Sequence, residues 1–306
     1  MWKKPLIGLL AGLTTVILGT SVAATADAAP KPPRPKPQYV ALGDSYAAGD
    51  GAGSYLSDGT DCYRSLLGYP GLVAASGNLA LDLQACSGAV ASDVLNLQLA
   101  TLSTSTGYVT VTVGGNDVGF ADVITTCLGT DTTACLAAIT TAETKATTEL
   151  PTKLDAVFSA VKTKAPTAKV VATNYPRLFN GSDCSLWTSF TAQEMTRLNE
   201  GSDTLAAVIS TAASTAGIGF TDVRTPFVGH AVCDSTPWIH NVELWTQFES
   251  FHPNADGYRY GYTPAALKGL GVVTSRPGKG KPTVTTGGLT STNTSRGHVQ
   301  INPAQS

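Results

Sequence analysis

The chain has 306 residues, a formal net charge of −2 and only 14% charged residues. It lacks the clustered Lys and Arg of a nucleic-acid-binding surface, so we expect no nucleic-acid partner. Its length fits one α/β domain with added terminal segments, because such domains commonly reach roughly 250 residues.

Residues 1–28 have the pattern of a secretory signal peptide. A short positive region precedes an apolar run over residues 6–18, and small residues surround Ala28. The run is shorter than the roughly 20 residues of a membrane span. We therefore predict cleavage near Ala28 and a secreted protein rather than a retained membrane anchor. Residues 29–37 are rich in proline and predict an extended spacer.

Residues 38–273 form the predicted domain, in which short strand-like segments alternate with segments of helical periodicity. The predicted strands cover residues 39–42, 79–85, 108–113, 169–173 and 218–223. The predicted helices cover residues 65–76, 92–102, 136–164 (with a break at Pro151), 192–215 and 255–270. This alternation indicates a three-layer α/β/α fold around a five-stranded parallel sheet. Residues 274–306, rich in small and polar residues, predict a disordered tail.

The six cysteines predict disulfide bonds, because an even number in an exported chain is typical of oxidised pairs. Closely spaced Cys and His pairs of a zinc site are lacking, so we expect no metal. Six cysteines allow 15 pairings. Pairing neighbours along the chain closes a loop within or beside a connection each time, and gives Cys62–Cys86, Cys127–Cys135 and Cys184–Cys233.

Four short segments carry residues suited to catalysis. They are "GDSY" (43–46), "CSGA" (86–89) and "GGND" (114–117), which follow the first three predicted strands, and "FHPN" (251–254), which opens the last predicted helix. Because ligand sites in open parallel sheets lie beyond the carboxyl ends of the strands, we expect these segments to share one site.

The residue types in these segments fit acyl transfer. A serine hydroxyl needs a base within hydrogen-bond reach, and histidine is the usual one. Ser45 is therefore the candidate nucleophile and His252 the candidate base. The developing oxyanion needs fixed donors, which the backbone N–H groups of Ser45 and Gly88 and the side-chain amide of Asn116 can supply. This chemistry requires no cofactor.

The four segments, in this order, resemble the sequence blocks of the SGNH, or GDSL-type, serine hydrolases. The layout of residues 38–271 is similar to that of the secreted actinobacterial lipases and phospholipases of that family. The resemblance implies a flavodoxin-like fold with three disulfides, Ser45 as nucleophile, Gly88 and Asn116 in the oxyanion hole, and His252 as base. The α/β-hydrolase elbow G-x-S-x-G fits less well, because Ala47 occupies its last position.

One position departs from the family pattern. Many members carry Asp three residues before the histidine, whereas this chain has Glu249 there. Glutamate is one methylene longer, so a Ser45–His252–Glu249 triad competes with a Ser–His dyad in which the carbonyl of Ser250 holds Nδ1–H. Either arrangement would fix the tautomer, and we favour the dyad.

The resemblance favours a lipase or esterase, including a phospholipase A, that acts on small-molecule or lipid esters. We expect a monomer that makes transient contact with a lipid interface. The alternatives are a carbohydrate acetyl esterase and a noncatalytic binding protein on the same fold. Ser45 could also be an ordinary turn residue, and His230 and His240 are alternative bases.

Overall fold

The computed structural model describes residues 1–2, 35–274 and 284–285. Most of the predicted signal peptide, spacer and tail therefore lies outside the described residues. The chain divides into Met1–Pro35 and Lys36–Ser306, and every element named below belongs to the second unit. Among the described residues, none of the helices combines the length and the apolar character needed to cross a membrane.

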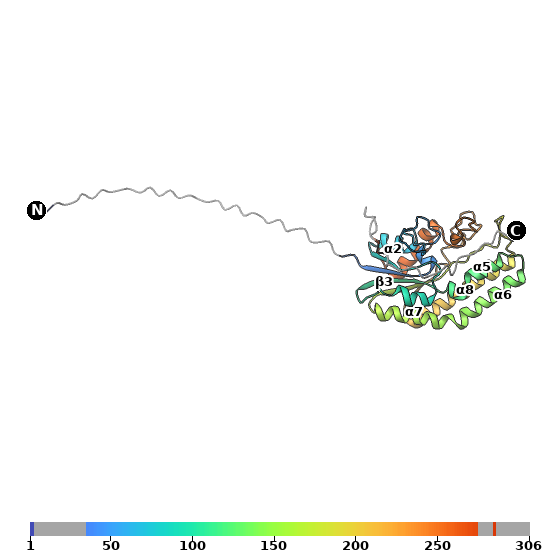
Figure 1. Ribbon diagram of the computed structural model, residues 1–306, viewed down its shortest axis with the longest axis horizontal. Coiled ribbons are helices and arrows are strands. Elements are labelled where there is room, and N and C mark those ends of the chain that lie inside the picture. The colour runs from blue at the N-terminus through green and yellow to red at the C-terminus, as the bar shows by residue number, and fades with distance from the viewer. Residues whose placement is uncertain (3–34, 275–283, 286–306) are drawn as a thin grey trace. The chain divides into compact units, whose positions relative to one another are not determined.

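A parallel sheet forms the centre of the second unit, with the strand order β5-β4-β3-β1-β2-β6 (Figure 1). Its strands are β1 (Gln38–Gly43), β2 (Ala80–Leu83), β3 (Thr106–Thr112), β4 (Lys169–Thr173), β5 (Gly219–Thr221) and β6 (Val284–Thr285). The five predicted strands are all present, which confirms the α/β fold. The sixth, β6, was not expected: it lies in the segment predicted as a tail and pairs with Leu81 and Asp82 of β2.

Helices cover both faces of the sheet, with α2 on one side and α7 and α8 on the other (Figure 1). The α-helices are α1 (Ser45–Ala48), α2 (Tyr69–Gly77), α3 (Ala91–Asp93), α4 (Gly115–Val118), α5 (Phe120–Cys127), α6 (Thr132–Thr148), α7 (Leu150–Lys164), α8 (Ala192–Ala216) and α9 (Thr263–Leu270). Two π-helical turns, η1 (Val94–Gln98) and η3 (Gly257–Tyr262), and the 3-10 turn η2 (Gln247–Glu249) complete the set.

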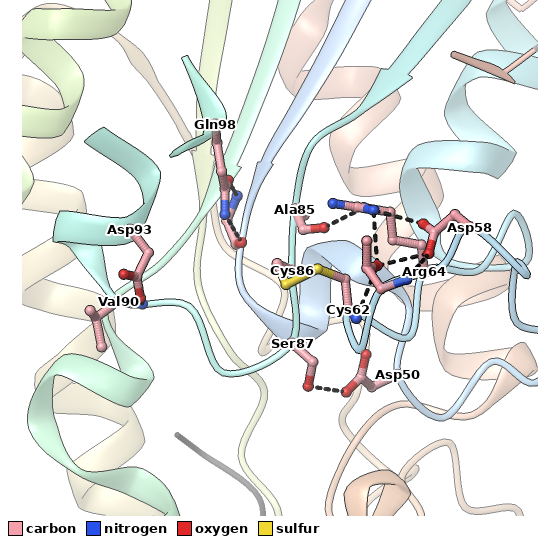
Figure 2. The surroundings of a disulfide bond; sticks show 12 residues. Asp50, Asp58, Cys62, Arg64, Ala85, Cys86, Ser87, Val90, Asp93 and Gln98 are labelled. Atoms are coloured by element: carbon pink, nitrogen blue, oxygen red, sulfur yellow. Dashed lines mark hydrogen bonds and ion pairs between the residues drawn. A yellow bond between two sulfur atoms is a disulfide. The ribbon is translucent and has the colours of Figure 1, made fainter. Parts of the chain in front are cut away.

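Several helix boundaries differ from the predicted ones for local reasons. The first predicted helix, 65–76, begins only at Tyr69, because Gly68 is extended and Pro70 sits in the first turn. The second begins at Ala91, and the Asp93 carboxylate accepts a hydrogen bond from the N–H of Val90 at 3.0 Å (Figure 2). The short helices α4 and α5 were not predicted. The four residues of α4 lie between Gly114 and Gly119 and read as a turn, and the eight residues of α5 give only about two turns of helical periodicity.

The core contains buried polar groups that are paired across the sheet. All side chains from Tyr39 to Leu42 in β1 are fully buried. The Tyr69 hydroxyl lies 2.9 Å from Thr112 Oγ1, which lies 2.6 Å from Thr173 Oγ1. Hydroxyl groups in such a chain satisfy each other, so burial of these threonines costs little.

The three predicted disulfide pairings are the ones present: Cys62–Cys86, Cys127–Cys135 and Cys184–Cys233. The first closes a separation of 24 residues and joins the segment after α1 to the segment after β2. The third closes a separation of 49 residues between two loops. Both lie beside segments that contribute to the site described next.

Candidate active site

Ser45 is placed at the first position of α1, directly beyond the carboxyl end of β1. Gly43 makes this sharp transition feasible. Its φ is +131°, and a Cβ at this position would lie 2.0 Å from the carbonyl oxygen of Thr112. Only glycine avoids that clash. Asp44 then caps the helix by accepting a hydrogen bond from the N–H of Tyr46.

His252 lies far from Ser45 in the sequence but contacts it in the folded domain. Its Nε2 lies 2.7 Å from Ser45 Oγ, and its Nδ1 lies 3.1 Å from the carbonyl oxygen of Ser250. Both side chains are buried. A carbonyl can only accept, so this geometry suits a neutral imidazole with the proton on Nδ1 and a lone pair on Nε2. Such an imidazole can remove the hydroxyl proton from Ser45.

Glu249, the alternative partner of the histidine, has hydrogen bonds of its own. Its carboxylate accepts from the hydroxyl of Tyr55 and from that of Thr246, at 2.7 Å. The first of these bonds links the carboxylate to the segment after α1. The carbonyl of Ser250 lies within hydrogen-bond distance of Nδ1, which is the contact that the dyad requires.

Asn116 and Asp117 join the "GGND" segment to the "CSGA" segment. Asn116 Nδ2 donates to the carbonyl of Ala89 at 3.0 Å. Asp117 Oδ2 accepts from the N–H of Ala91 at 2.9 Å. A side-chain amide carries two N–H donors, so Asn116 retains a second one for a substrate oxygen. The two segments that hold the candidate oxyanion donors therefore act as one unit.

Gly88 lies in a turn with φ +76°, a conformation that favours glycine. Within the residues that the structure describes, the backbone N–H groups of Gly88 and Ser45 have no hydrogen-bond partner in the protein. The preceding residue, Ser87, donates its hydroxyl to Asp50 at 2.7 Å, and Cys86 is held by the disulfide to Cys62 (Figure 2). The turn is thus fixed while its N–H remains available.

A buried network that the sequence did not reveal links the nucleophile to the "GGND" segment. The Tyr175 hydroxyl donates to Asp44 Oδ2 at 2.5 Å and accepts from the N–H of Gly115 at 3.0 Å. Burial raises the pKa of Asp44 to about 7, against the lowering effect of the hydrogen bonds from Tyr175 and Tyr46. The aspartate before the nucleophile is therefore a structural anchor that titrates near neutral pH.

Two tyrosine hydroxyls hold the nucleophile segment against the histidine segment. Tyr46 donates to the carbonyl of Phe251 at 2.7 Å, and Tyr258 donates to the carbonyl of Asp50 at 2.8 Å. Phe251, next to His252, has φ +61°, which costs a bulky residue roughly 1–3 kcal/mol. The surrounding bonds over-determine this conformation, which supports a positioning role for the segment.

A cavity of about 80 Å³ opens beside Ser45, Asn116 and His252. Its walls come from the loop after β4 and from α4, α5, α6 and α8. Nine apolar side chains contribute to them: Val118, Phe120, Val123, Ile139, Ala142, Ala146, Leu178, Leu198 and Leu205. Glu143 also lines it and is held by Arg197 at 2.7 Å. A pocket of this composition accepts a hydrocarbon chain.

The other candidate histidines are engaged elsewhere. His230 stacks on Trp238 with ring centroids 3.6 Å apart and places Nδ1 2.8 Å from the carbonyl of Thr236. His240 places Nε2 2.9 Å from the carbonyl of Gly51. Among the described residues, no group of His, Cys, Asp and Glu is arranged to hold a metal ion.

Comparison with known proteins gives consistent matches. The model of the GDSL-like lipase/acylhydrolase family matches residues 41–260. Lipase 1 of Streptomyces coelicolor is 43% identical over 266 residues, which cover 86% of this chain and 98% of that protein.

The matching solved structures include two Streptomyces enzymes. Phospholipase A1 from Streptomyces albidoflavus aligns with a TM-score of 0.74 at 42% identity, covering 76% of this chain and 99% of that one. An extracellular lipase from Streptomyces rimosus aligns with a TM-score of 0.73 at 42% identity and the same coverage.

Proposed function

The chain belongs to the GDSL-like lipase/acylhydrolase family and is a carboxylic ester hydrolase, and we propose that it is a secreted enzyme that cleaves lipid esters through a Ser45–His252 dyad. The observation that carries the proposal is the 2.7 Å contact between Ser45 Oγ and His252 Nε2, at the edge of an apolar cavity. Export is supported by the N-terminal sequence pattern.

In the first step, Ser45 Oγ attacks the ester carbonyl while His252 Nε2 takes the hydroxyl proton. The resulting oxyanion is bound by the N–H groups of Ser45 and Gly88 and by Asn116 Nδ2. His252 then donates its proton to the leaving alcohol, and the acyl group remains on Ser45.

In the second step, His252 Nε2 removes a proton from water, and the hydroxide equivalent attacks the acyl-enzyme carbonyl. Collapse of the tetrahedral intermediate releases the carboxylic acid and returns the proton to Ser45. Throughout both steps, the Nδ1–H of His252 donates to the Ser250 carbonyl, which orients the ring and supports the imidazolium.

The apolar cavity supports an acyl chain rather than an acetyl group as the preferred acid part of the ester. Burial of each methylene contributes about 0.8 kcal/mol, so longer chains gain binding energy until the cavity is full. A carbohydrate acetyl esterase has no use for this pocket, and a noncatalytic binding protein has no use for the Ser45–His252 contact. Both alternatives are therefore less well supported.

The test uses the secreted chain and its Ser45→Ala variant with p-nitrophenyl esters of increasing acyl length and with phosphatidylcholine. We expect Ser45→Ala to lose at least about 10⁴-fold in kcat. Retention of the wild-type rate by this variant would show that another residue is the nucleophile. A preference for acetate over every longer ester would favour the carbohydrate esterase alternative.

Histidine variants provide a matched control. His252→Gln is expected to lose activity to a similar extent as Ser45→Ala, whereas His230→Gln should retain it, since His230 stacks on Trp238 away from Ser45. Glu249→Gln distinguishes dyad from triad. A change within about threefold supports the dyad, and a loss above about 10²-fold would establish the triad.

The cavity is tested by Ala142→Phe, which fills space at a half-buried wall position. The phenylalanine ring takes space from a long acyl chain but not from a short one. We therefore expect kcat/KM for long acyl chains to fall about tenfold, which corresponds to about 1.4 kcal/mol, while turnover of short esters changes little. An equal loss on all chain lengths would argue that the acyl chain binds elsewhere.

A further inference from the structure

Four large apolar side chains are exposed at the tips of two loops. The exposed fractions are 95% for Leu186, 65% for Trp187, 37% for Leu244 and 97% for Trp245. Single exposed apolar residues are common on protein surfaces, but two tryptophans, each next to a leucine at a loop tip, are not an ordinary surface composition. We call these four residues the docking tips.

The first loop is held rigidly in the shape that exposes its tip. The carboxylate of Asp183 accepts hydrogen bonds from the N–H of Ser185 at 3.1 Å, from the hydroxyl of Thr188 at 2.6 Å and from the N–H of Phe190 at 2.9 Å. The next residue, Cys184, is bonded to Cys233. This bracing projects the tip into solvent instead of allowing it to fold inward.

The second loop is attached to the first at the same disulfide. Asn241 Nδ2 lies 3.7 Å from the sulfur of Cys184 and 3.9 Å from that of Cys233. Trp187 is three residues from Cys184, and Trp245 is four residues from Asn241. An extended residue spans at most about 3.6 Å, so both tips lie within a short reach of one point on the surface.

Both loops also contact the segment that carries His252. Phe190, at the end of the first loop, packs edge-on against Phe251 with ring centroids 6.1 Å apart. In the second loop, the N–H of Glu243 donates to Ser250 Oγ at 2.9 Å. The docking tips therefore extend from the catalytic end of the domain, where an ester must enter.

The charge of these loops identifies the kind of surface they fit. Residues 180–190 and 240–248 contain Asp183 and Glu243 but no Lys or Arg. An anionic membrane attracts basic segments, so it would gain nothing from these loops. Tryptophan prefers the boundary between water and hydrocarbon, where its ring is amphipathic.

We propose that Leu186, Trp187, Leu244 and Trp245 form a docking surface that inserts into uncharged or zwitterionic lipid–water interfaces and presents the catalytic end of the domain to its substrate. This proposal rests on the proposed lipid-ester hydrolysis. Docking occurs through burial of the tips in the interface and does not depend on attraction between opposite charges.

The binding experiment uses the full secreted chain with Ser45→Ala, so that hydrolysis cannot alter the vesicles. Co-flotation with phosphatidylcholine vesicles measures the lipid concentration at half binding. We expect Trp187→Ser/Trp245→Ser to raise that concentration at least about tenfold, since each ring loses apolar burial. Val273→Ser is the matched control. Val273 is 89% exposed and lies shortly after the end of α9 at Leu270.

The activity experiment uses the same Trp variants with Ser45 intact. Hydrolysis of phosphatidylcholine vesicles is expected to fall about tenfold, while kcat/KM for dissolved p-nitrophenyl butyrate stays within about twofold of wild type. Trp187→Phe/Trp245→Phe should recover most of the vesicle activity, because phenylalanine retains an aromatic apolar ring.

Three outcomes would overturn the proposal. The first is unchanged vesicle binding in the Trp variant. The second is an equal loss on the dissolved ester, which would place these residues in the reaction site itself. The third is binding that requires phosphatidylglycerol or disappears in high salt, which would indicate an electrostatic surface. If wild type hydrolyses no ester but Trp-dependent flotation persists, docking stands and the proposed function fails.

Discussion

Two disulfides brace the catalytic end of the domain, and they differ in what surrounds them. Cys62 and Cys86 are buried, with 4% and 6% of their surface exposed, whereas Cys184 lies in an exposed loop. We call Cys62–Cys86 the inner disulfide and Cys184–Cys233 the outer disulfide. The inner disulfide is adjacent to the turn of Gly88, and the outer disulfide is adjacent to the docking tips. One disulfide thus holds a turn that carries a candidate oxyanion donor, and the other holds the loops that we propose bring the enzyme to its substrate.

The surroundings of the inner disulfide explain why that turn is the more constrained region. The buried Arg64 donates from Nε to the carbonyl of Ala85 at 2.8 Å and pairs with Asp58 at 2.7 Å (Figure 2). On the other side of the disulfide, the Ser87 hydroxyl donates a hydrogen bond to Asp50. Donors for an oxyanion must be fixed before the charge develops, whereas a docking loop needs only to expose its apolar tip.

Among the variants that follow, Asn116→Ala is expected to produce the largest loss of kcat. Loss of one oxyanion donor costs roughly 2.7–4 kcal/mol of transition-state stabilisation. We therefore expect kcat for p-nitrophenyl butyrate to fall about 10²–10³-fold with a smaller change in KM. Steady-state kinetics on the dissolved ester measure this. A loss below about fivefold would remove Asn116 from the oxyanion hole.

Removal of the inner disulfide should affect both stability and turnover. Cys62→Ala/Cys86→Ala is expected to lower the free energy of unfolding by roughly 2–4 kcal/mol. It should also lower kcat at temperatures well below unfolding, because the turn that carries the Gly88 N–H loses its covalent anchor. Urea unfolding and kinetics on the same sample test both. An unchanged kcat would show that Asp50 and Arg64 suffice to hold the turn.

Tyr175→Phe removes one hydroxyl from the buried network. The Asp44 carboxyl then loses a donor and the Gly115 N–H loses its acceptor, which costs about 1–3 kcal/mol. We expect lower stability and a fall in kcat of about tenfold. Tyr39→Phe is the control, because its hydroxyl bonds Thr110 within the sheet at 2.8 Å. Equal kcat losses in the two variants would contradict a positioning role for Tyr175.

The pH dependence of stability tests the environment of Asp44. Its pKa is raised by burial from 3.8 to about 7, so between about pH 4 and 7 the native state binds a proton that the unfolded state has released. The free energy of unfolding therefore falls as pH rises through this window, by at most about 1.4 kcal/mol per pH unit for one proton.

Asp44→Asn should flatten that slope, as measured by urea unfolding at several pH values. A residual slope of the same sign is expected from Asp50, whose pKa burial also raises. The exposed Asp155→Asn is the matched control for removal of a carboxylate. A slope that is identical in wild type and Asp44→Asn would show that Asp44 is ionised throughout the range.

The outer disulfide should give the smallest effect on chemistry. Cys184→Ala/Cys233→Ala is expected to keep kcat/KM for a dissolved ester within about twofold, because the bond does not touch the oxyanion donors. Vesicle hydrolysis should decrease, since the loops that carry Trp187 and Trp245 lose their common anchor. Comparable losses on dissolved and vesicle substrates would contradict the assignment of the outer disulfide to docking rather than to the reaction.

Local sequence was sufficient for the features that depend on local chemistry. Short strand-like segments between segments of helical periodicity identified the five strands, and β4 (Lys169–Thr173) has the predicted bounds. Pro151 separates α6 from α7, as expected for a residue without an N–H. Glycine-rich strand ends, together with the rule for parallel sheets, predicted one site for "GDSY", "CSGA" and "GGND", and "FHPN" at the start of the last predicted helix supplied the candidate base.

Only the tertiary structure decided which side chains support that site. Tyr175 reaches Asp44 across 131 residues, and Ser87 reaches Asp50 across 37. No period or motif signals such contacts, because they arise when separate strand ends converge. The same holds for the exposure of Trp187 and Trp245. For His252 Nδ1, the sequence offered both the Ser250 carbonyl and Glu249, and the contact with the Ser250 carbonyl is seen in the structure. Sequence supplied the reacting groups, whereas packing fixed their partners, since hydrogen bonds depend on distances set by the whole fold.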